Sequence, residues 1–211
     1  MIKIVIFDCD GVLCDSERIA FECTLKVLAS FGVVVDINDY LWMSGMSEED
    51  CTKYFLDKFN VDIKLDKFIE IKHELFRTLM NSDNIKPLAD LISFMKDLKN
   101  RNIKMAIASS SSLRHINTVI DLLNINEYID FVVCGQEVKH KKPAKDIYAL
   151  AIQKANENIK NIIAIEDSYV GISSAKLAGL YVVGFKASSL KQDTSLADEE
   201  VYKFSDIKIL H

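Results

Sequence analysis

Residues 2–11 read IKIVIFDCDG, and this stretch decides the fold. It begins with a nearly continuous run of apolar, β-branched residues, Ile2–Phe7, and two aspartates follow directly, Asp8 and Asp10. Apolar runs of this length are typical of strands that are buried on both faces of a parallel sheet. The stretch therefore predicts a central parallel strand that ends in an acidic turn, and Gly11 permits a tight turn there.

The rest of the chain repeats the apolar pattern and alternates it with helical patterns. Further apolar runs occur at Lys104–Ala108, Phe131–Cys134, Ile162–Ile165 and Tyr181–Phe185. Amphipathic stretches of helical length lie between or after them, at Leu113–Leu123, Ala144–Ala155 and Val170–Ala178. This alternation predicts an α/β fold, with an open, Rossmann-like parallel sheet and right-handed crossovers.

One long interval contains helical patterns and no convincing strand. It includes amphipathic stretches at Glu17–Phe31, Asp36–Met43, Ser47–Phe59 and Leu65–Met80, with Gly32 as a helix stop and Ser47 as an N-cap. We therefore predict that residues 16–84 form an all-helical cap domain inserted after the first strand. Residues 1–15 and 85–211 would form the core domain.

Composition narrows the classes of function. Hydrophobic residues make up 49% of the 211 residues, and the formal net charge is −5, which argues against nucleic-acid or anionic-membrane partners. The five cysteines show no CxxC spacing, and the four histidines show no close pairing, so we expect reduced thiols and no zinc site. The first apolar run is too short for a signal peptide or a membrane span, so we expect a cytoplasmic protein. A monomer is the default expectation.

Polar side chains follow each of the first four predicted strands. They are Asp8 with Asp10, then Ser109, then the lysines at 139–142, and finally Glu166 with Asp167. Because ligands bind outside the carboxyl ends of parallel strands, we expect these groups to converge at one edge of the sheet. Carboxylates, a hydroxyl and an amine are the groups that phosphoryl transfer to a carboxylate requires.

Four segments carry a resemblance to a known family: FDCDGVLCDSE (7–17), IASSSS (107–112), KKPAKDIY (141–148) and IEDSYVGISSAKLAG (165–179). In this order and spacing they resemble the four motifs of the haloacid dehalogenase superfamily, in the branch of β-phosphoglucomutase-like proteins and sugar-phosphate phosphatases. The resemblance covers the whole chain. The first and fourth motifs are the most specific.

The resemblance implies catalytic roles for four residues. Asp8 would be the nucleophile that forms an aspartyl-phosphate, and Asp10 the general acid and then the general base. Ser109 would hydrogen-bond the phosphate, and Lys142 would neutralise its charge. Lys142 is preferred over its neighbours because Pro143 follows it and is expected to open the next helix.

The resemblance also implies a magnesium site. Asp8, the main-chain carbonyl of Asp10 and Asp167 would bind Mg²⁺, and Glu166 would contribute directly or through water. The ion and the lysine are needed because an anionic carboxylate has to approach an anionic phosphate.

Structural roles are the alternative for several of these residues. Ser109–Ser112 could be a loop and an N-cap, and Glu166 with Asp167 could be a surface acid pair. Lys139 and Lys141 are expected to be solvated. Cys9 is expected to be a small filler between the two aspartates.

The predicted function is Mg²⁺-dependent hydrolysis of a small phosphomonoester, such as a sugar phosphate. Asp10 disfavours the dehalogenases and phosphonatases of the superfamily, which lack an aspartate at this position. A β-phosphoglucomutase-type mutase is the alternative. Such a mutase carries a histidine, a lysine and an arginine in its cap. The resemblance aligns these three residues with Ala20, Ser44 and Glu48 of this chain, and Glu48 would repel a second phosphate.

A non-catalytic phospho-acceptor of the receiver type is the alternative from a different class. Receivers also carry an acid pair after the first strand. However, they take the phosphate on an aspartate after a later strand and have no helical insertion of this size.

Overall fold

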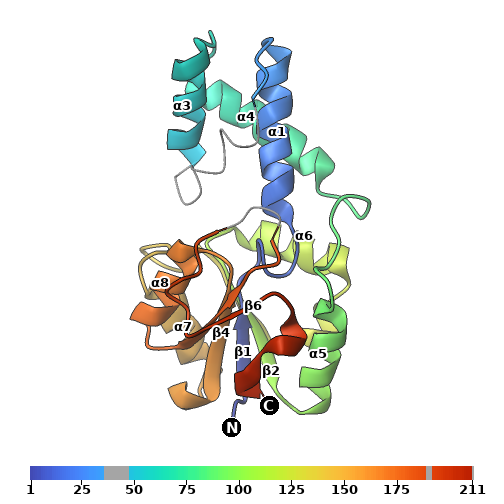
Figure 1. The fold of residues 1–211 in the computed structure, drawn as a ribbon, viewed down its shortest axis with the longest axis vertical. Helices are drawn as coiled ribbons and strands as arrows, with labels where there is room; N and C mark the ends of the chain where they lie inside the picture. The colour runs from blue at the N-terminus through green and yellow to red at the C-terminus, as the bar shows by residue number, and fades with distance from the viewer. Residues whose placement is uncertain (36–47, 189–191, 211) are drawn as a thin grey trace. The chain divides into compact units, whose positions relative to one another are not determined.

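The computed structural model describes residues 1–35, 48–188 and 192–210 (Figure 1). The chain divides into two compact units. One contains Met1–Asp15 and Ile85–His211, and the other contains Ser16–Asn84. No helix of the described residues is long and apolar enough to cross a membrane.

The larger unit is built on a six-stranded parallel sheet, which confirms the predicted α/β class. The strand order is β3-β2-β1-β4-β5-β6. The strands are β1 (Ile4–Phe7), β2 (Lys104–Ala108), β3 (Phe131–Val133), β4 (Ile162–Glu166), β5 (Tyr181–Phe185) and β6 (Glu199–Val201). The sequence did not predict β6, because this edge strand is short and has no apolar run.

The position of β1 determines where a ligand can bind. In the register, Ile4 lies opposite Lys104 of β2 on one side and opposite Ile162 of β4 on the other. The chain adds β2 and β3 on one side of β1 and then reverses to add β4, β5 and β6 on the other. The carboxyl ends of β1 and β4 therefore form the topological switch point, where open α/β sheets bind their ligands.

Helices cover both faces of this sheet. In Figure 1, the sheet lies between α7 (Asp146–Ala155) and α8 (Tyr169–Leu177) on one side and α5 (Leu91–Asn100) on the other. Helix α6 spans Leu113–Leu123. The short 3-10 helices are η1 (Asn126–Tyr128), η2 (Ile159–Asn161), η3 (Phe204–Asp206) and η4 (Lys208–Leu210).

Apolar packing on the two faces buries the strands. The α7 and α8 face is filled by aliphatic residues, among them Ile6, Ala164 and Ile172. The opposite face is aromatic, and the ring of Phe204 stacks on Phe185 with centroids 4.1 Å apart. The strands carry apolar side chains on both faces for this reason.

The segment before α7 differs from the prediction. Pro143 was expected to open the helix, but the Lys142–Pro143 peptide is cis and α7 begins three residues later, at Asp146. A turn precedes the helix instead, and within it the N–H of Ala144 donates to the carbonyl of Lys141. Lys142 is therefore positioned by a turn and not by the first turn of α7.

The smaller unit is helical in its described part. It contains α1 (Ser16–Ser30), α3 (Glu48–Phe59) and α4 (Leu65–Leu79), around a core of six buried residues: Val27, Leu28, Val35, Phe55, Leu56 and Phe68. Gly32 follows α1 with φ +77°, as a glycine stop does. The predicted helix at Asp36–Met43, the Ser47 cap and the Ser44–Ser47 part of the mutase comparison lie outside the described residues.

The two segments of the larger unit contact each other next to the point where residues 16–84 begin and end. Cys14 forms an isolated antiparallel bridge with Pro87. The N–H of Leu88 donates to the carbonyl of Leu13 at 3.0 Å. The segments immediately before and after residues 16–84 are therefore hydrogen-bonded to each other within the larger unit.

Candidate active site

Three carboxylates meet at the switch point. Asp8 follows β1, Glu166 is the last residue of β4, and Asp167 comes next. Each offers an oxygen within 4.8 Å of the other two, and all three residues are buried. The surface acid pair that was the alternative for Glu166 and Asp167 is therefore wrong, since their exposed fractions are 0% and 2%.

Lys142 compensates part of this buried negative charge. Its Nζ donates to Oδ1 of Asp8 at 2.5 Å, to Oε1 of Glu166 at 2.6 Å and to the carbonyl of Ala108 at 2.9 Å. Burial alone would lower the pKa of the lysine, but Asp8 and Glu166 outweigh burial and hold that pKa above its ordinary value. The ammonium is therefore charged and fixed against Asp8.

One cation does not balance three carboxylates. Burial, opposed in part by Lys142, raises the pKa of Asp8 to about 8. A divalent cation beside these carboxylates would favour the ionised form of Asp8 and lower that pKa. The cluster thus has a deficit of positive charge that a metal ion fits.

The contacts of Glu166 support the same fit. Its Oε1 accepts from Lys142 and, at 2.6 Å, from the phenol of Tyr148. Its Oε2 is buried and has no hydrogen-bond partner among the described residues. Leaving a buried carboxylate oxygen unsatisfied is costly, so this oxygen is available to a metal ion or to its bound water.

Two glycines allow the backbone to approach the carboxylates closely. Gly11 has φ +82°, and a Cβ added to it would lie 1.9 Å from Oδ2 of Asp167. A Cβ on Gly171, in the first turn of α8, would lie 2.0 Å from Oε2 of Glu166. Any larger residue at either position would occupy the space next to a carboxylate.

Asp10 lies beside the cluster and has different partners. Its Oδ2 accepts from the hydroxyl of Ser111 at 2.9 Å, and its Oδ1 lies 2.8 Å from Nε2 of His115. Burial would lower the pKa of the imidazole, but the hydrogen bond and the charge of Asp10 outweigh burial and raise the pKa. Sequence spacing gave no sign of His115, which is 105 positions from Asp10.

Cys9 lies between the two aspartates and is fully buried. A donor atom of Cys9 lies within 4.8 Å of donor atoms of Asp10 and His115, a grouping that the spacing of cysteines and histidines did not predict. Burial raises the pKa of the Cys9 thiol well above its ordinary value. Its full burial between the two aspartates is compatible with the small filler that was expected at this position.

The serines at 109–112, after β2, have different contacts. Ser109 is buried, and its Oγ accepts from the N–H of Ser111 at 3.1 Å. Ser112 is the N-cap of α6 and accepts from the N–H of His115. The alternative role for this run, as a loop and an N-cap, therefore applies to Ser112. Ser109 lies next to Ala108, whose carbonyl accepts from Lys142.

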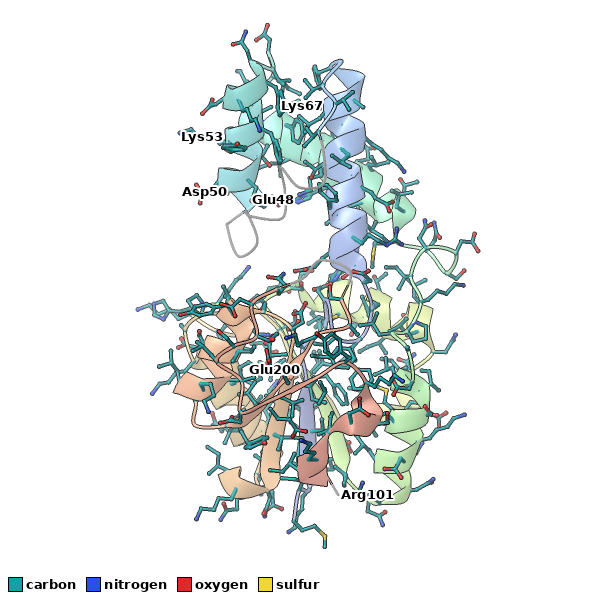
Figure 2. All side chains as sticks on the ribbon, viewed as in Figure 1. Glu48, Asp50, Lys53, Lys67, Arg101 and Glu200 are labelled. Atoms are coloured by element: carbon teal, nitrogen blue, oxygen red, sulfur yellow. The ribbon has the colours of Figure 1, made fainter. Side chains whose placement is uncertain are left out.

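A charged network in the helical unit changes the expectation for Glu48. This residue begins α3 and is labelled in Figure 2. Its Oε1 accepts from Nζ of Lys72 at 2.7 Å, and its Oε2 lies 2.8 Å from Nε2 of His73. Lys72 therefore offsets the negative charge that was expected to repel a second phosphate.

The chain is similar to known proteins over most of its length. The model of the haloacid dehalogenase-like hydrolase family matches residues 5–185. The chain is 28% identical over 194 residues to the phosphorylated carbohydrates phosphatase of Thermotoga maritima, covering 92% of this chain and 89% of that protein. It is 27% identical over 179 residues to the fructose-1-phosphate phosphatase YqaB of Escherichia coli, covering 85% and 94% of the two chains.

The chain is also similar in fold to a solved structure. The crystal structure of a β-phosphoglucomutase from Clostridium difficile superposes with a TM-score of 0.75 and 25% sequence identity. The match covers all of this chain and 95% of the other.

Proposed function

The chain belongs to the haloacid dehalogenase-like hydrolases, and we propose that it is a Mg²⁺-dependent phosphatase acting through an aspartyl-phosphate at Asp8. Its substrate would be a small phosphomonoester, a sugar phosphate or a related metabolite. The observation that carries the proposal is the buried contact between Asp8 and Lys142 within the three-carboxylate cluster.

In the first step, an oxygen of Asp8 attacks phosphorus, and the bond from phosphorus to the ester oxygen breaks. Asp10 gives its proton to the departing oxygen, so that an alcohol leaves rather than an alkoxide. Lys142 neutralises negative charge as the two anions meet. In the second step, Asp10 takes a proton from water, the water attacks phosphorus, and the bond to Asp8 breaks to release phosphate.

Asp8, Asp167 and the main-chain carbonyl of Asp10 would hold Mg²⁺, with Glu166 contributing directly or through water. The fit is supported by the clustered carboxylates and by the buried Oε2 of Glu166. When bound, the ion supplies positive charge at the transferring phosphoryl group. Ser109, next to the carbonyl that Lys142 contacts, would hydrogen-bond the phosphate.

The substrate class rests on the relatives. Those named for phosphorylated carbohydrates and for fructose 1-phosphate support a sugar phosphate. We propose that residues 16–84 act as the cap that selects among such esters, since specificity requires contacts beyond the phosphate.

The test is phosphate release from 4-nitrophenyl phosphate and from a panel of sugar phosphates, with and without Mg²⁺. Asp8→Asn and Asp10→Asn should each abolish release from the sugar phosphates, and Asp193→Asn, an exposed aspartate, is the matched control. Full activity of Asp8→Asn would overturn the mechanism.

The likeness to a β-phosphoglucomutase keeps a mutase as the second candidate. Incubation with β-glucose 1-phosphate and a trace of the bisphosphate separates the two functions. A phosphatase should release free phosphate. Accumulation of glucose 6-phosphate without free phosphate would favour the mutase.

A further inference from the structure

Asp10 is held at both of its carboxylate oxygens by residues that follow a different strand. Ser111, in the loop after β2, donates to Oδ2 at 2.9 Å. His115, in the first turn of α6, lies 2.8 Å from Oδ1 through its Nε2. The hydroxyl of Ser111 donates to Oδ2, and an N–H at Nε2 of His115 would donate to Oδ1. A protonated carboxyl keeps acceptor capacity on both oxygens, so both contacts are compatible with an Asp10 that carries the proton it gives. Two donors on two oxygens fix the plane of the carboxylate.

Such restraint matters at this position. The side chain of Asp10 is 23% exposed, so packing alone does not fix it. A general acid must lie within hydrogen-bond reach of the oxygen it protonates, and a misplacement of about 1 Å can cost on the order of 100-fold in rate. An aspartate at a partly open strand end therefore needs other groups to hold its orientation.

The two donors are themselves fixed by the fold. The N–H of His115 donates to the N-cap hydroxyl of Ser112, and the next residue, Ile116, is fully buried. The imidazole is only 18% exposed. The N–H of Ser111 donates to Oγ of Ser109, which is buried. The hydrogen bonds to Asp10 thus start from anchored backbone.

We propose that His115, together with Ser111, positions Asp10 for proton transfer to the leaving group. This inference rests on the proposed phosphatase mechanism and adds positioning residues to it. Neither residue reacts with the substrate. Their effect is on the orientation of Asp10, so it should depend on how strongly the leaving oxygen needs a proton.

Two almost identical substrates measure that dependence. Phenol leaves from phenyl phosphate with a pKa of about 10, as for the tyrosine side chain, and needs a proton in the transition state. The nitro group of 4-nitrophenyl phosphate makes the phenolate a much better leaving group. Because kcat/KM reports the steps up to release of the leaving group, its ratio for the two esters isolates the acid role of Asp10.

We expect His115→Ala to lower kcat/KM about tenfold for phenyl phosphate and about twofold or less for 4-nitrophenyl phosphate. Ser111→Ala should shift the ratio in the same direction. His115→Gln returns an N–H near the position of Nε2 and should restore most of the lost activity. His140→Ala removes a more exposed histidine–aspartate pair, His140 Nδ1 with Asp146 Oδ2 at 3.1 Å, and should leave the ratio unchanged.

Equal losses on both esters, or a His115→Gln variant no better than His115→Ala, would overturn the proposal in favour of a purely structural role. If His115→Ala does not fold, Ser111→Ala decides the question by the same ratio. Failure of the phosphatase mechanism is distinguishable, because it would be seen as activity in Asp8→Asn, whatever the ratio in the His115 variants.

Discussion

Gly11→Ala should separate backbone strain from damage to the proposed metal site. Gly11 and Gly32 both have positive φ, at +82° and +77°, so an alanine at either position costs about 1–2 kcal/mol in backbone strain. The surroundings of the two residues differ. The new Cβ would lie 1.9 Å from Oδ2 of Asp167 at Gly11, whereas no described atom lies within 4 Å of it at Gly32.

The magnitude follows from these distances. Ordinary contact begins near 3.4 Å, so Asp167 or the Gly11 backbone has to move by about 1.5 Å. Metal–ligand distances tolerate only about 0.2 Å, so Asp167 cannot make room for the methyl group and still bind the ion. We expect Gly11→Ala to weaken Mg²⁺ binding by at least 10–100-fold, the loss seen when groups that orient metal ligands are removed.

The assay is the Mg²⁺ concentration that gives half-maximal phosphatase activity, measured beside urea unfolding in the presence of a chelator. Gly32→Ala should show the strain cost in unfolding and unchanged Mg²⁺ dependence. Gly11→Ala should show at least the same strain cost, because Asp167 or the backbone also has to move, and a large rise in the half-saturating Mg²⁺ concentration. If Gly11→Ala requires no more Mg²⁺ than Gly32→Ala, the inferred role of Asp167 as a metal ligand is refuted.

Three further predictions concern stability. Tyr148→Phe removes the buried hydrogen bond to Glu166 and should lower the unfolding free energy by about 1.5–3 kcal/mol, seen as a lower urea midpoint; a loss within error would contradict it. Lys142→Met leaves Asp8 and Glu166 without their cation, so Mg²⁺ should raise the Tm of this variant more than that of the parent; equal rises would count against the charge deficit. The N–H of Asn158, the amide of Asn161 and Lys3 lower the pKa of Glu157 to about 2, so this group stabilises the fold above its unfolded pKa of about 4.3 and loses that contribution as the pH falls toward 2. Glu157→Gln should therefore show a shallower fall in unfolding free energy across this range, and an unchanged slope would argue against these hydrogen bonds.

The sheet could be predicted because burial on both faces leaves a simple pattern. Lys104–Ala108 and Tyr181–Phe185 form strands at their predicted bounds, since continuous apolar runs of this length fit a parallel sheet. β6 could not be predicted, because Glu199 and Glu200 at the sheet edge are not constrained to be apolar. The predicted start of α7 at Pro143 was wrong, because a local sequence does not distinguish a proline in a turn from a proline at the start of a helix.

The candidate site divides in the same way. The meeting of Asp8 with Glu166 and Asp167 follows from parallel strands that end at one edge, which a sequence can indicate. The partners of Asp10 do not follow from such a pattern. The place of His115 depends on the angle at which α6 leaves the loop after β2, and that angle is set by tertiary packing. Tyr148 was part of a recognised motif, but only its burial against Glu166 shows what its hydroxyl does.

The bridge between Cys14 and Pro87, and the hydrogen bond from the N–H of Leu88 to the carbonyl of Leu13, have a consequence for how the chain can change. They close the chain across residues 16–84 from within the core. The entropy of closing such a segment grows only slowly with its length, and each doubling costs about 0.6 kcal/mol. A longer, shorter or unrelated segment could therefore replace this one at small cost to the sheet. Substitutions and length changes can accumulate between residues 15 and 85 while the sheet edge that carries Asp8, Glu166 and Asp167 stays the same.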